Sequence, residues 1–266
     1  MRAPPELTIS VSQVKTWLRC PRQYQLRYVQ GVPAAFVPVA LAFGSCFHSA
    51  LGFFYGTLKT AGSAPPLLAL QQLFVDAWSA AGSGPIPLQN EEDDEDLGKQ
   101  LDKGVGMLAA FYAHATAQPV SKVEAIELPF SVPVHHPETG EVLEEKLVGV
   151  IDLVVEEDGH KVIVEHKSSS KKYTLDQFKY DLQPTCYQLA AQTLGWGEVG
   201  LRYQVVTKAK TAAVQVEDVL RDEQDTDDFL HTVVGVLRAV DCGVFFPVRG
   251  WQCRSCQYAH ACEGPS

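Results

Sequence analysis

Apolar residues recur every three to four positions along much of the chain, which is the spacing of amphipathic helices. Ser10 and Gln13 form a capping-box pattern, which predicts that a helix begins there. Similar spacing predicts further helices over residues 43–55, 67–78, 97–114, 181–194 and 229–240. Because residues 57–120 hold only helical patterns and loops, we expect a helical lobe in that region.

The period changes to the alternation of β-strands after about residue 122. It predicts strands over residues 123–132, 144–155, 161–167, 201–207 and 214–219. Asp158 and Gly159 separate the second and third of these strands. This pair is a strong signal for a two-residue hairpin, because both positions of a type I′ turn need a positive φ. Helices, a hairpin, a helix and further strands together predict a mixed α/β core.

The register of this hairpin brings charged side chains together. With that turn, Asp152 lies directly opposite Glu165 on one face. Lys167 projects from the same face, since side chains alternate with a period of two. Val154 and Ile163 share that face, which indicates a half-buried site. Two carboxylates there are costly unless a cation joins them, and oxygen ligands suit a hard divalent ion such as Mg2+ or Mn2+.

Composition and charge narrow the choice of partner. Of the 266 residues, 46% are hydrophobic and 20% charged, which is typical of a folded globular protein. A net charge of −10 argues at first against nucleic acid. Residues 91–96 and 217–228, however, contribute −12, while residues 1–31 and 160–210 each carry +4 and are available to a phosphate backbone. The acidic run at 91–96 is also expected to cap or precede the helix that follows it.

The longest apolar stretch, residues 32–47, is interrupted by Pro33 and Pro38. A membrane-spanning helix needs about 20 predominantly apolar residues. Residues 1–10 lack the continuous apolar segment of a signal peptide. We therefore expect no membrane span and a cytoplasmic protein.

Seven cysteines are an odd number, which disfavours a framework of disulfides in a chain without an export signal. Cys253, Cys256 and Cys262 form a C-x2-C-x5-C pattern near the C-terminus, and Cys20 lies far upstream. Four thiolates suit either an iron–sulfur cluster or zinc. Such a site would join the cysteine-rich tail, residues 241–266, to Cys20.

Four residues of the hairpin carry a resemblance to a known family. Asp152, Glu165-x-Lys167 and Gly149, three residues before the aspartate, resemble the signature of the PD-(D/E)xK nucleases. The resemblance implies a single domain over residues 1–266. It also implies a restriction-endonuclease-like core, in which a central mixed β-sheet is flanked by helices.

Further residues resemble the RecB-like branch of these nucleases. His48, four residues after Gly44, resembles its motif-I histidine, and Gln183-x-x-x-Tyr187 resembles its Q-x-x-x-Y motif. The cysteine quartet resembles the four-cysteine iron–sulfur arrangement of the AddB nuclease domain and of the CRISPR adaptation exonuclease. By this resemblance Cys20 and the three C-terminal cysteines hold a [4Fe-4S] cluster, with zinc as the alternative occupant.

The same resemblance implies a metal-dependent mechanism. His48, Asp152 and Glu165 would hold Mg2+ or Mn2+, together with the backbone carbonyl of His166. Lys167 would position or help to deprotonate the attacking water and stabilise the charge that develops on the phosphate.

Gln183 and Tyr187 would hold the DNA strand or the scissile phosphate. Two neighbouring side chains are interpreted differently. The side chain of His166 is expected to be packed and hydrogen bonded in the core. Glu127, on the preceding strand, is expected to be a solvated carboxylate rather than a metal ligand.

The function implied by the resemblance is exonucleolytic cleavage of DNA, single-stranded by analogy, in repair, recombination or CRISPR adaptation. Two alternatives remain open at this stage. One is a DNA-binding subunit of a helicase or integrase complex that does not cut. The other is a site-specific endonuclease of the same superfamily, which would need a base-reading element that the sequence does not reveal.

Overall fold

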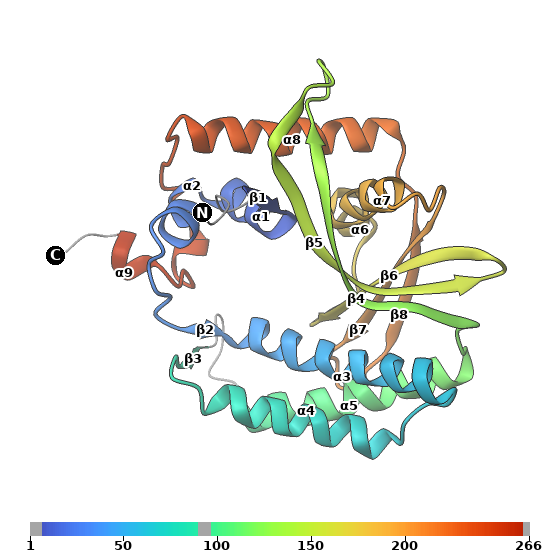
Figure 1. Cartoon of the computed structure of the whole chain (residues 1–266). Helices are drawn as coiled ribbons and strands as arrows, with labels where there is room; N and C mark the ends of the chain where they lie inside the picture. The colour runs from blue at the N-terminus through green and yellow to red at the C-terminus, as the bar shows by residue number, and fades with distance from the viewer. Residues whose placement is uncertain (1–6, 90–96, 263–266) are drawn as a thin grey trace, which may run out of the picture.

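A computed structural model of the chain describes residues 7–89 and 97–262. Its centre is a mixed sheet of six strands (Figure 1). These strands are β1 (Thr8–Ser10), β4 (Lys122–His135), β5 (Val142–Glu157), β6 (His160–Ser169), β7 (Gly200–Thr207) and β8 (Val214–Val219). The acidic run at 91–96 lies outside the described residues, so its predicted role as a helix cap stays a prediction.

The order across the sheet is β1-β5-β6-β7-β8, and β4 pairs with β5 as well. The β1–β5 and β6–β7 pairs are parallel, and the other pairs are antiparallel. The predicted mixed α/β core is therefore confirmed. Two further strands, β2 (Val37–Pro38) and β3 (Leu88–Gln89), form a separate parallel pair.

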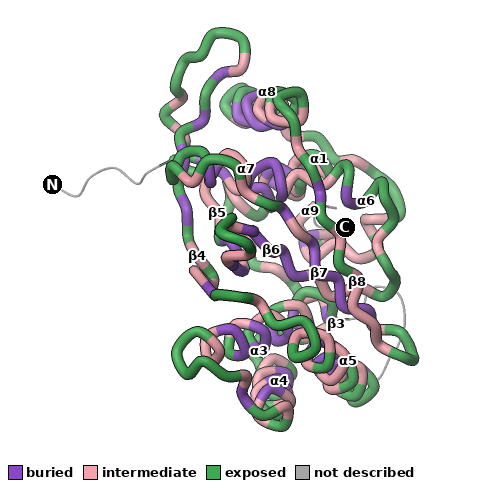
Figure 2. Tube along the Cα trace, turned by 90° about the vertical axis from the view of Figure 1, so that its right-hand side faces the viewer, coloured by how far each residue is buried: buried purple, intermediate pink, exposed green. Residues whose placement is uncertain are grey.

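Helices cover both faces of the sheet. One face packs on α1 (Val11–Arg19), α7 (Gln183–Thr193) and α8 (Glu223–Asp241). The other face packs on α3 (Val39–Ala61), α4 (Leu67–Gly82) and α5 (Leu97–Ala117). In Figure 2 the buried strand segments run between these two helical layers.

The predicted helical segment over residues 57–120 comprises the end of α3 together with α4 and α5. Their buried residues form one cluster with those of the sheet, including Leu153 and Val164. Whether this layer is a separate lobe of a single domain stays a prediction.

The hairpin between β5 and β6 has the predicted register. Asp158 and Gly159 have φ values of 49° and 81°, as a turn of positive φ requires. Cα pairing runs from Glu157↔His160 to Leu153↔Val164. Asp152 and Glu165 stand one step beyond the last of these pairs.

Helix boundaries differ from the sequence prediction where side-chain caps decide them. Ser10 and Gln13 form the predicted capping box at the start of α1. Asp222 forms another with Asp225, so α8 begins at residue 223, six residues before its predicted start. Capping by Thr174 also supports a short helix that the periodicity does not predict, α6 (Leu175–Tyr180).

A segment near the N-terminus and the C-terminal segment lie side by side. Figure 1 places α9 (Ala259–Cys262) next to α2 (Pro21–Tyr24), which is followed by a π-helical turn over Gln25–Val29. The amide of Ala35 donates to the carbonyl of Gln257 at 3.0 Å. The tail also contains a short 3-10 helix, Trp251–Cys253.

By length and composition alone, α3 is apolar enough to cross a membrane, but half of the relevant window is buried inside the protein. Its residues Phe43, Phe47 and Ala50 are completely buried against α4, α5 and the sheet. The apolar character of α3 is therefore explained by core packing.

Candidate active site

Asp152 lies where β5 leaves its pairing with β6. The backbone N–H of His166 donates to Asp152 Oδ2 at 2.9 Å, which fixes the carboxylate against the neighbouring strand. His48 approaches from α3, and its Nδ1 lies 3.6 Å from the same oxygen. The hairpin and the helix of the opposite layer therefore converge on one carboxylate.

Electrostatics couple these groups. Burial opposes the ionisation of Asp152, but the nearby His48 and His166 hold its pKa below the usual value. Burial would likewise lower the pKa of His48, yet its interaction with Asp152 raises it. Each group therefore favours the charged form of the other.

Glu165 is buried and accepts two hydrogen bonds. Lys167 Nζ donates to Oε1, and the hydroxyl of Tyr187 donates to Oε2 at 2.5 Å. Burial raises the pKa of Glu165, Lys167 opposes that effect, and Asp152 adds to it. Burial alone would lower the pKa of Lys167, but the charge of Glu165 raises it above its usual value. The predicted trio of Asp152, Glu165 and Lys167 is thus brought together.

A close contact explains the glycine of the sequence pattern. Gly149 lies directly opposite Phe130 in the β4–β5 ladder, and a Cβ at this glycine would stand 2.5 Å from Phe130 Cζ. The ring of Phe130 packs edge-on against Tyr187, with centroids 6.2 Å apart. The missing side chain of Gly149 therefore leaves room for Phe130, which packs against the tyrosine that donates to Glu165.

Gln183 and Tyr187 occupy different environments, although they lie one turn apart on α7. Tyr187 is only 2% exposed, and its hydroxyl meets Glu165 and the carbonyl of Val150 instead of solvent. Gln183 is partly exposed at the start of α7. The predicted role of holding DNA therefore suits Gln183, whereas the contacts of Tyr187 suit positioning of Glu165.

His166 packs on the opposite face of the sheet, as expected. Its ring stacks on Tyr55 at 5.5 Å between centroids and meets Phe111 edge-on. Neither ring nitrogen makes a hydrogen bond of good geometry among the described residues, although the side chain of Gln204 interacts with the ring, so the expectation that the ring is hydrogen bonded stays a prediction. Burial lowers the pKa of His166 to about 4, so the ring is neutral at pH 7.

Glu127 is exposed on β4, as predicted for a solvated carboxylate. Its φ of 45° interrupts the regular pairing of β4 with β5. A Cβ at Gly52, one turn after His48 on α3, would lie 3.5 Å from a carboxylate oxygen of Glu127. The side chain therefore lies against α3, near His48.

Two residues that the sequence analysis did not single out also border the trio. Lys15 on α1 donates to Asp181 Oδ1 at 2.5 Å, and the same oxygen accepts from the backbone N–H of Gln183 at 3.0 Å. The charge of Asp181 raises the pKa of Lys167 further. An aspartate two residues before Gln183-Pro184 is a local capping signal, but no local pattern could have indicated Lys15.

The donor set suits a hard divalent cation, with two carboxylates and an imidazole facing one another. Among the residues that the structure describes, however, no group of three or more His, Cys, Asp or Glu side chains is arranged to hold a metal ion. Glu165 is engaged by Lys167, and His48 is engaged by Asp152. A cation would therefore have to replace Lys167 on Glu165 and come between His48 and Asp152.

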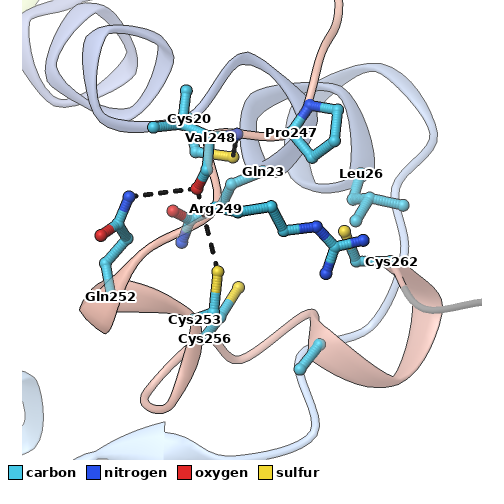
Figure 3. A pocket seen from close by; sticks show the side chains of 11 residues that line it. Cys20, Gln23, Leu26, Pro247, Val248, Arg249, Gln252, Cys253, Cys256 and Cys262 are labelled. Atoms are coloured by element: carbon cyan, nitrogen blue, oxygen red, sulfur yellow. Dashed lines mark hydrogen bonds between the residues drawn. The ribbon is translucent and has the colours of Figure 1, made fainter.

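The four predicted cysteines Cys20, Cys253, Cys256 and Cys262 line one pocket, at the junction of the two chain ends (Figure 3). The amide of Val248 donates to Cys20 Sγ at 3.5 Å, and the carbonyl of Val248 accepts from the Cys253 thiol at 3.8 Å.

Burial raises the pKa of Cys256, and the other three thiols raise it further. Four thiols that repel one another when ionised fit a soft metal centre, which would neutralise them. The four thiols are gathered, but within the described part of the chain they do not stand in positions that would coordinate one metal ion.

Comparisons with known proteins bear on the family and the fold. The sequence profile of the PD-(D/E)XK nuclease superfamily matches residues 8–263. A crystal structure from Eubacterium rectale, described as a candidate exonuclease, shares 17% identity and a TM-score of 0.59, and the match covers 97% of this chain and 93% of that chain. The structure of SSO0001 shares 13% identity and a TM-score of 0.46, with 98% and 88% covered. No curated protein matches the chain. At these identities, the first structure shows a shared fold.

Proposed function

The chain belongs to the PD-(D/E)XK nuclease superfamily, and from this premise we propose that it is a metal-dependent DNA exonuclease. One observation carries the proposal: Asp152, Glu165 and Lys167 converge on the hairpin, and His48 lies 3.6 Å from Asp152. The carboxylates and the imidazole are ligands for a divalent cation, and the lysine is a cation that can face a phosphate. The intact trio also argues against a nuclease-like protein that only binds DNA.

We propose that His48, Asp152 and Glu165 hold Mg2+ or Mn2+. A bound divalent cation supplies a Lewis acid, which activates a water molecule and offsets charge on the phosphate. The fixed orientation of Asp152 supports this assignment, because the amide of His166 already holds its carboxylate in place. Tyr187 supports it from the other side by orienting Glu165.

Lys167 is assigned to charge stabilisation. Its raised pKa keeps the ammonium protonated at neutral pH, so it is poorly suited to remove a proton from water. A cation that replaced it on Glu165 would leave the ammonium free to face a phosphate oxygen. Gln183, partly exposed on the neighbouring helix, would donate hydrogen bonds to the strand.

We assign the pocket of Cys20, Cys253, Cys256 and Cys262 to a [4Fe-4S] cluster, with zinc as the alternative. The support is the set of four mutually interacting thiols at the junction of the chain ends. In either case the site is structural, because it joins segments more than two hundred residues apart.

Single-stranded DNA is the proposed substrate, by the resemblance to RecB-like nucleases. Repair, recombination and CRISPR adaptation are the processes that the same resemblance implies, with a helicase or integrase as a partner. We also propose that the protein acts in the cytoplasm, as the sequence analysis predicts. A binding subunit without activity remains the alternative function.

The exonuclease proposal is tested with linear and circular single-stranded DNA of the same sequence, and with the matching duplex, in Mn2+ and in EDTA. We expect degradation of the linear strand from an end, slower loss of the duplex and no loss of the circle. Cleavage of the circle would indicate an endonuclease. Binding of the linear strand without cleavage in Mn2+ would support the binding subunit.

A further inference from the structure

An ion pair outside the family pattern adjoins the catalytic trio. Lys15 on α1 and Asp181, just before α7, lie 166 positions apart, yet Nζ and Oδ1 are 2.5 Å from one another. The side chain of Asp181 is 11% exposed, whereas that of Lys15 is 43% exposed. The carboxylate is therefore fixed inside the protein, and the ammonium reaches its surface.

Asp181 is held from a second direction. Its Oδ1 also accepts from the backbone N–H of Gln183 at the start of α7. Its charge reaches Lys167, and both lysines hold the pKa of Asp181 below its usual value against the effect of burial. Asp181 thus connects α1, α7 and the end of β6 that carries Lys167.

Charge balance gives this pair a purpose beyond folding. Asp152, Glu165 and Asp181 would repel an approaching phosphate backbone, and Lys167 is engaged by Glu165. The carboxylate of Asp181 is largely buried, so its pairing with Lys15 also supports the fold. The ammonium of Lys15 nevertheless reaches the surface, where a phosphate can share it. Lys15 is therefore placed to offset the repulsion between these carboxylates and a negatively charged ligand.

We propose that Lys15 binds a DNA phosphate next to the scissile one, and that Asp181 is a positioning residue that aims the Lys15 ammonium. The proposal rests on the proposed function, since it assumes that DNA occupies the site. It assigns Lys15 to binding and leaves the chemical step to Lys167 and the carboxylates.

The test measures binding of a fluorescent single-stranded oligonucleotide over a range of salt concentrations, in EDTA to prevent cleavage. Each phosphate contact contributes about 0.7 to the slope of log affinity against log salt for single strands. We expect Lys15→Gln to lower the slope by about that amount and to weaken binding about tenfold at low salt. Lys15→Arg should restore most of the salt dependence and most of the affinity.

A matched control is Lys122, which also forms an ion pair but lies on β4 with Glu124 and Glu156. Lys122→Gln should leave slope and affinity unchanged. Equal slopes for Lys15→Gln and Lys122→Gln would overturn the proposal. Melting temperatures of both variants, measured alongside, separate lost binding from lost folding.

The role of Asp181 is tested by a double-mutant cycle. Asn can still accept the hydrogen bond from the backbone N–H of Gln183, so Asp181→Asn keeps this local contact at the start of α7. In that background Lys15→Gln should weaken binding by less than half the factor measured in the wild type, because an unaimed lysine contributes less. The same factor in both backgrounds would show that Asp181 does not position Lys15.

These outcomes are separate from those of the proposed function. Binding that depends on Lys15 without any cleavage in Mn2+ would keep the phosphate contact and reject the nuclease activity. Cleavage by Lys15→Gln with an unchanged KM would keep the nuclease activity and reject the phosphate contact. A wild-type protein that neither binds nor cleaves DNA would reject both.

Discussion

The hydroxyl of Tyr187 on α7 lies 2.5 Å from Glu165 Oε2 on β6, and both side chains are buried. This contact fixes the carboxylate that Lys167 also engages. It links the helical layer of α1, α7 and α8 to the end of the sheet where His48 arrives from the other layer. The position of Glu165 thus depends on Lys167 of its own strand and on Tyr187 of α7.

Removal of this hydroxyl should affect stability and metal binding together. Tyr187→Phe leaves a buried carboxylate oxygen with one donor fewer, which costs about 1–3 kcal/mol of unfolding free energy. The affinity for Mn2+ should also fall, because Glu165 is held less firmly. Urea denaturation and calorimetric titration with Mn2+ measure the two effects. Tyr180→Phe, at an exposed position, is the control, and equal behaviour of the two variants would contradict this role.

The contact of Gly149 with Phe130 predicts a second change in stability. A Cβ at Gly149 would lie 2.5 Å from the ring, so Gly149→Ala should destabilise the protein by about 1–3 kcal/mol through overpacking. Gly106 on α5 has nothing within 4 Å of an added Cβ. Gly106→Ala should therefore stabilise the protein by up to about 1 kcal/mol through helix propensity. Urea denaturation of both variants would contradict the account if the two changes had the same sign.

Burial of His166 predicts a dependence of stability on pH. Its folded-state pKa is about 4, whereas an unfolded histidine titrates near pH 6.5, so the unfolded chain binds this proton first as the pH falls. Stability should therefore decrease between pH 6.5 and 4, by up to about 3 kcal/mol for this group. The ring of His166 stacks on Tyr55, and His166→Phe keeps an aromatic ring there, so this variant should fold and lack this part of the dependence. If the unfolding free energies of wild type and His166→Phe changed in parallel with pH, His166 would not be the cause of the decrease.

The cysteine pocket predicts a colour. Protein purified without oxygen should show the broad visible absorbance of an iron–sulfur cluster, and Cys253→Ser should abolish it and lower the melting temperature. Cys242→Ser is a suitable control, because Cys242 is exposed and does not line the pocket. A colourless protein that contains one zinc ion per chain would exclude the cluster.

Local patterns account for the part of the site that the sequence predicts. The turn at Asp158-Gly159 sets the register of the hairpin, so Asp152 and Glu165 could be paired without any knowledge of the tertiary structure. Lys167 then follows from the alternation of side chains along β6. His48 was expected only from the family resemblance, because no local pattern brings α3 to this hairpin.

The remaining features depend on contacts between distant segments. Lys15 reaches Asp181 across 166 positions, and the hydroxyl of Tyr187 turns inward to Glu165. Strand β1 has three residues, too few for a periodic pattern, and it exists because Thr8–Ser10 pairs in parallel with β5. Such relationships are set by packing of the whole fold and leave no signal in a short stretch of sequence.

The most direct test of the central claim is a single-turnover cleavage assay with an end-labelled single-stranded oligonucleotide in Mn2+. Wild-type protein should cleave, EDTA should stop the reaction, and Lys167→Ala should be slower by about a hundredfold or more, because it lacks the cation that offsets charge on the phosphate. Lys122→Ala, which removes an exposed ammonium that pairs with Glu124 and Glu156 instead of the trio, should cleave at the wild-type rate. Undiminished cleavage by Lys167→Ala, or cleavage in EDTA, would contradict the assignment of the hairpin as the active site.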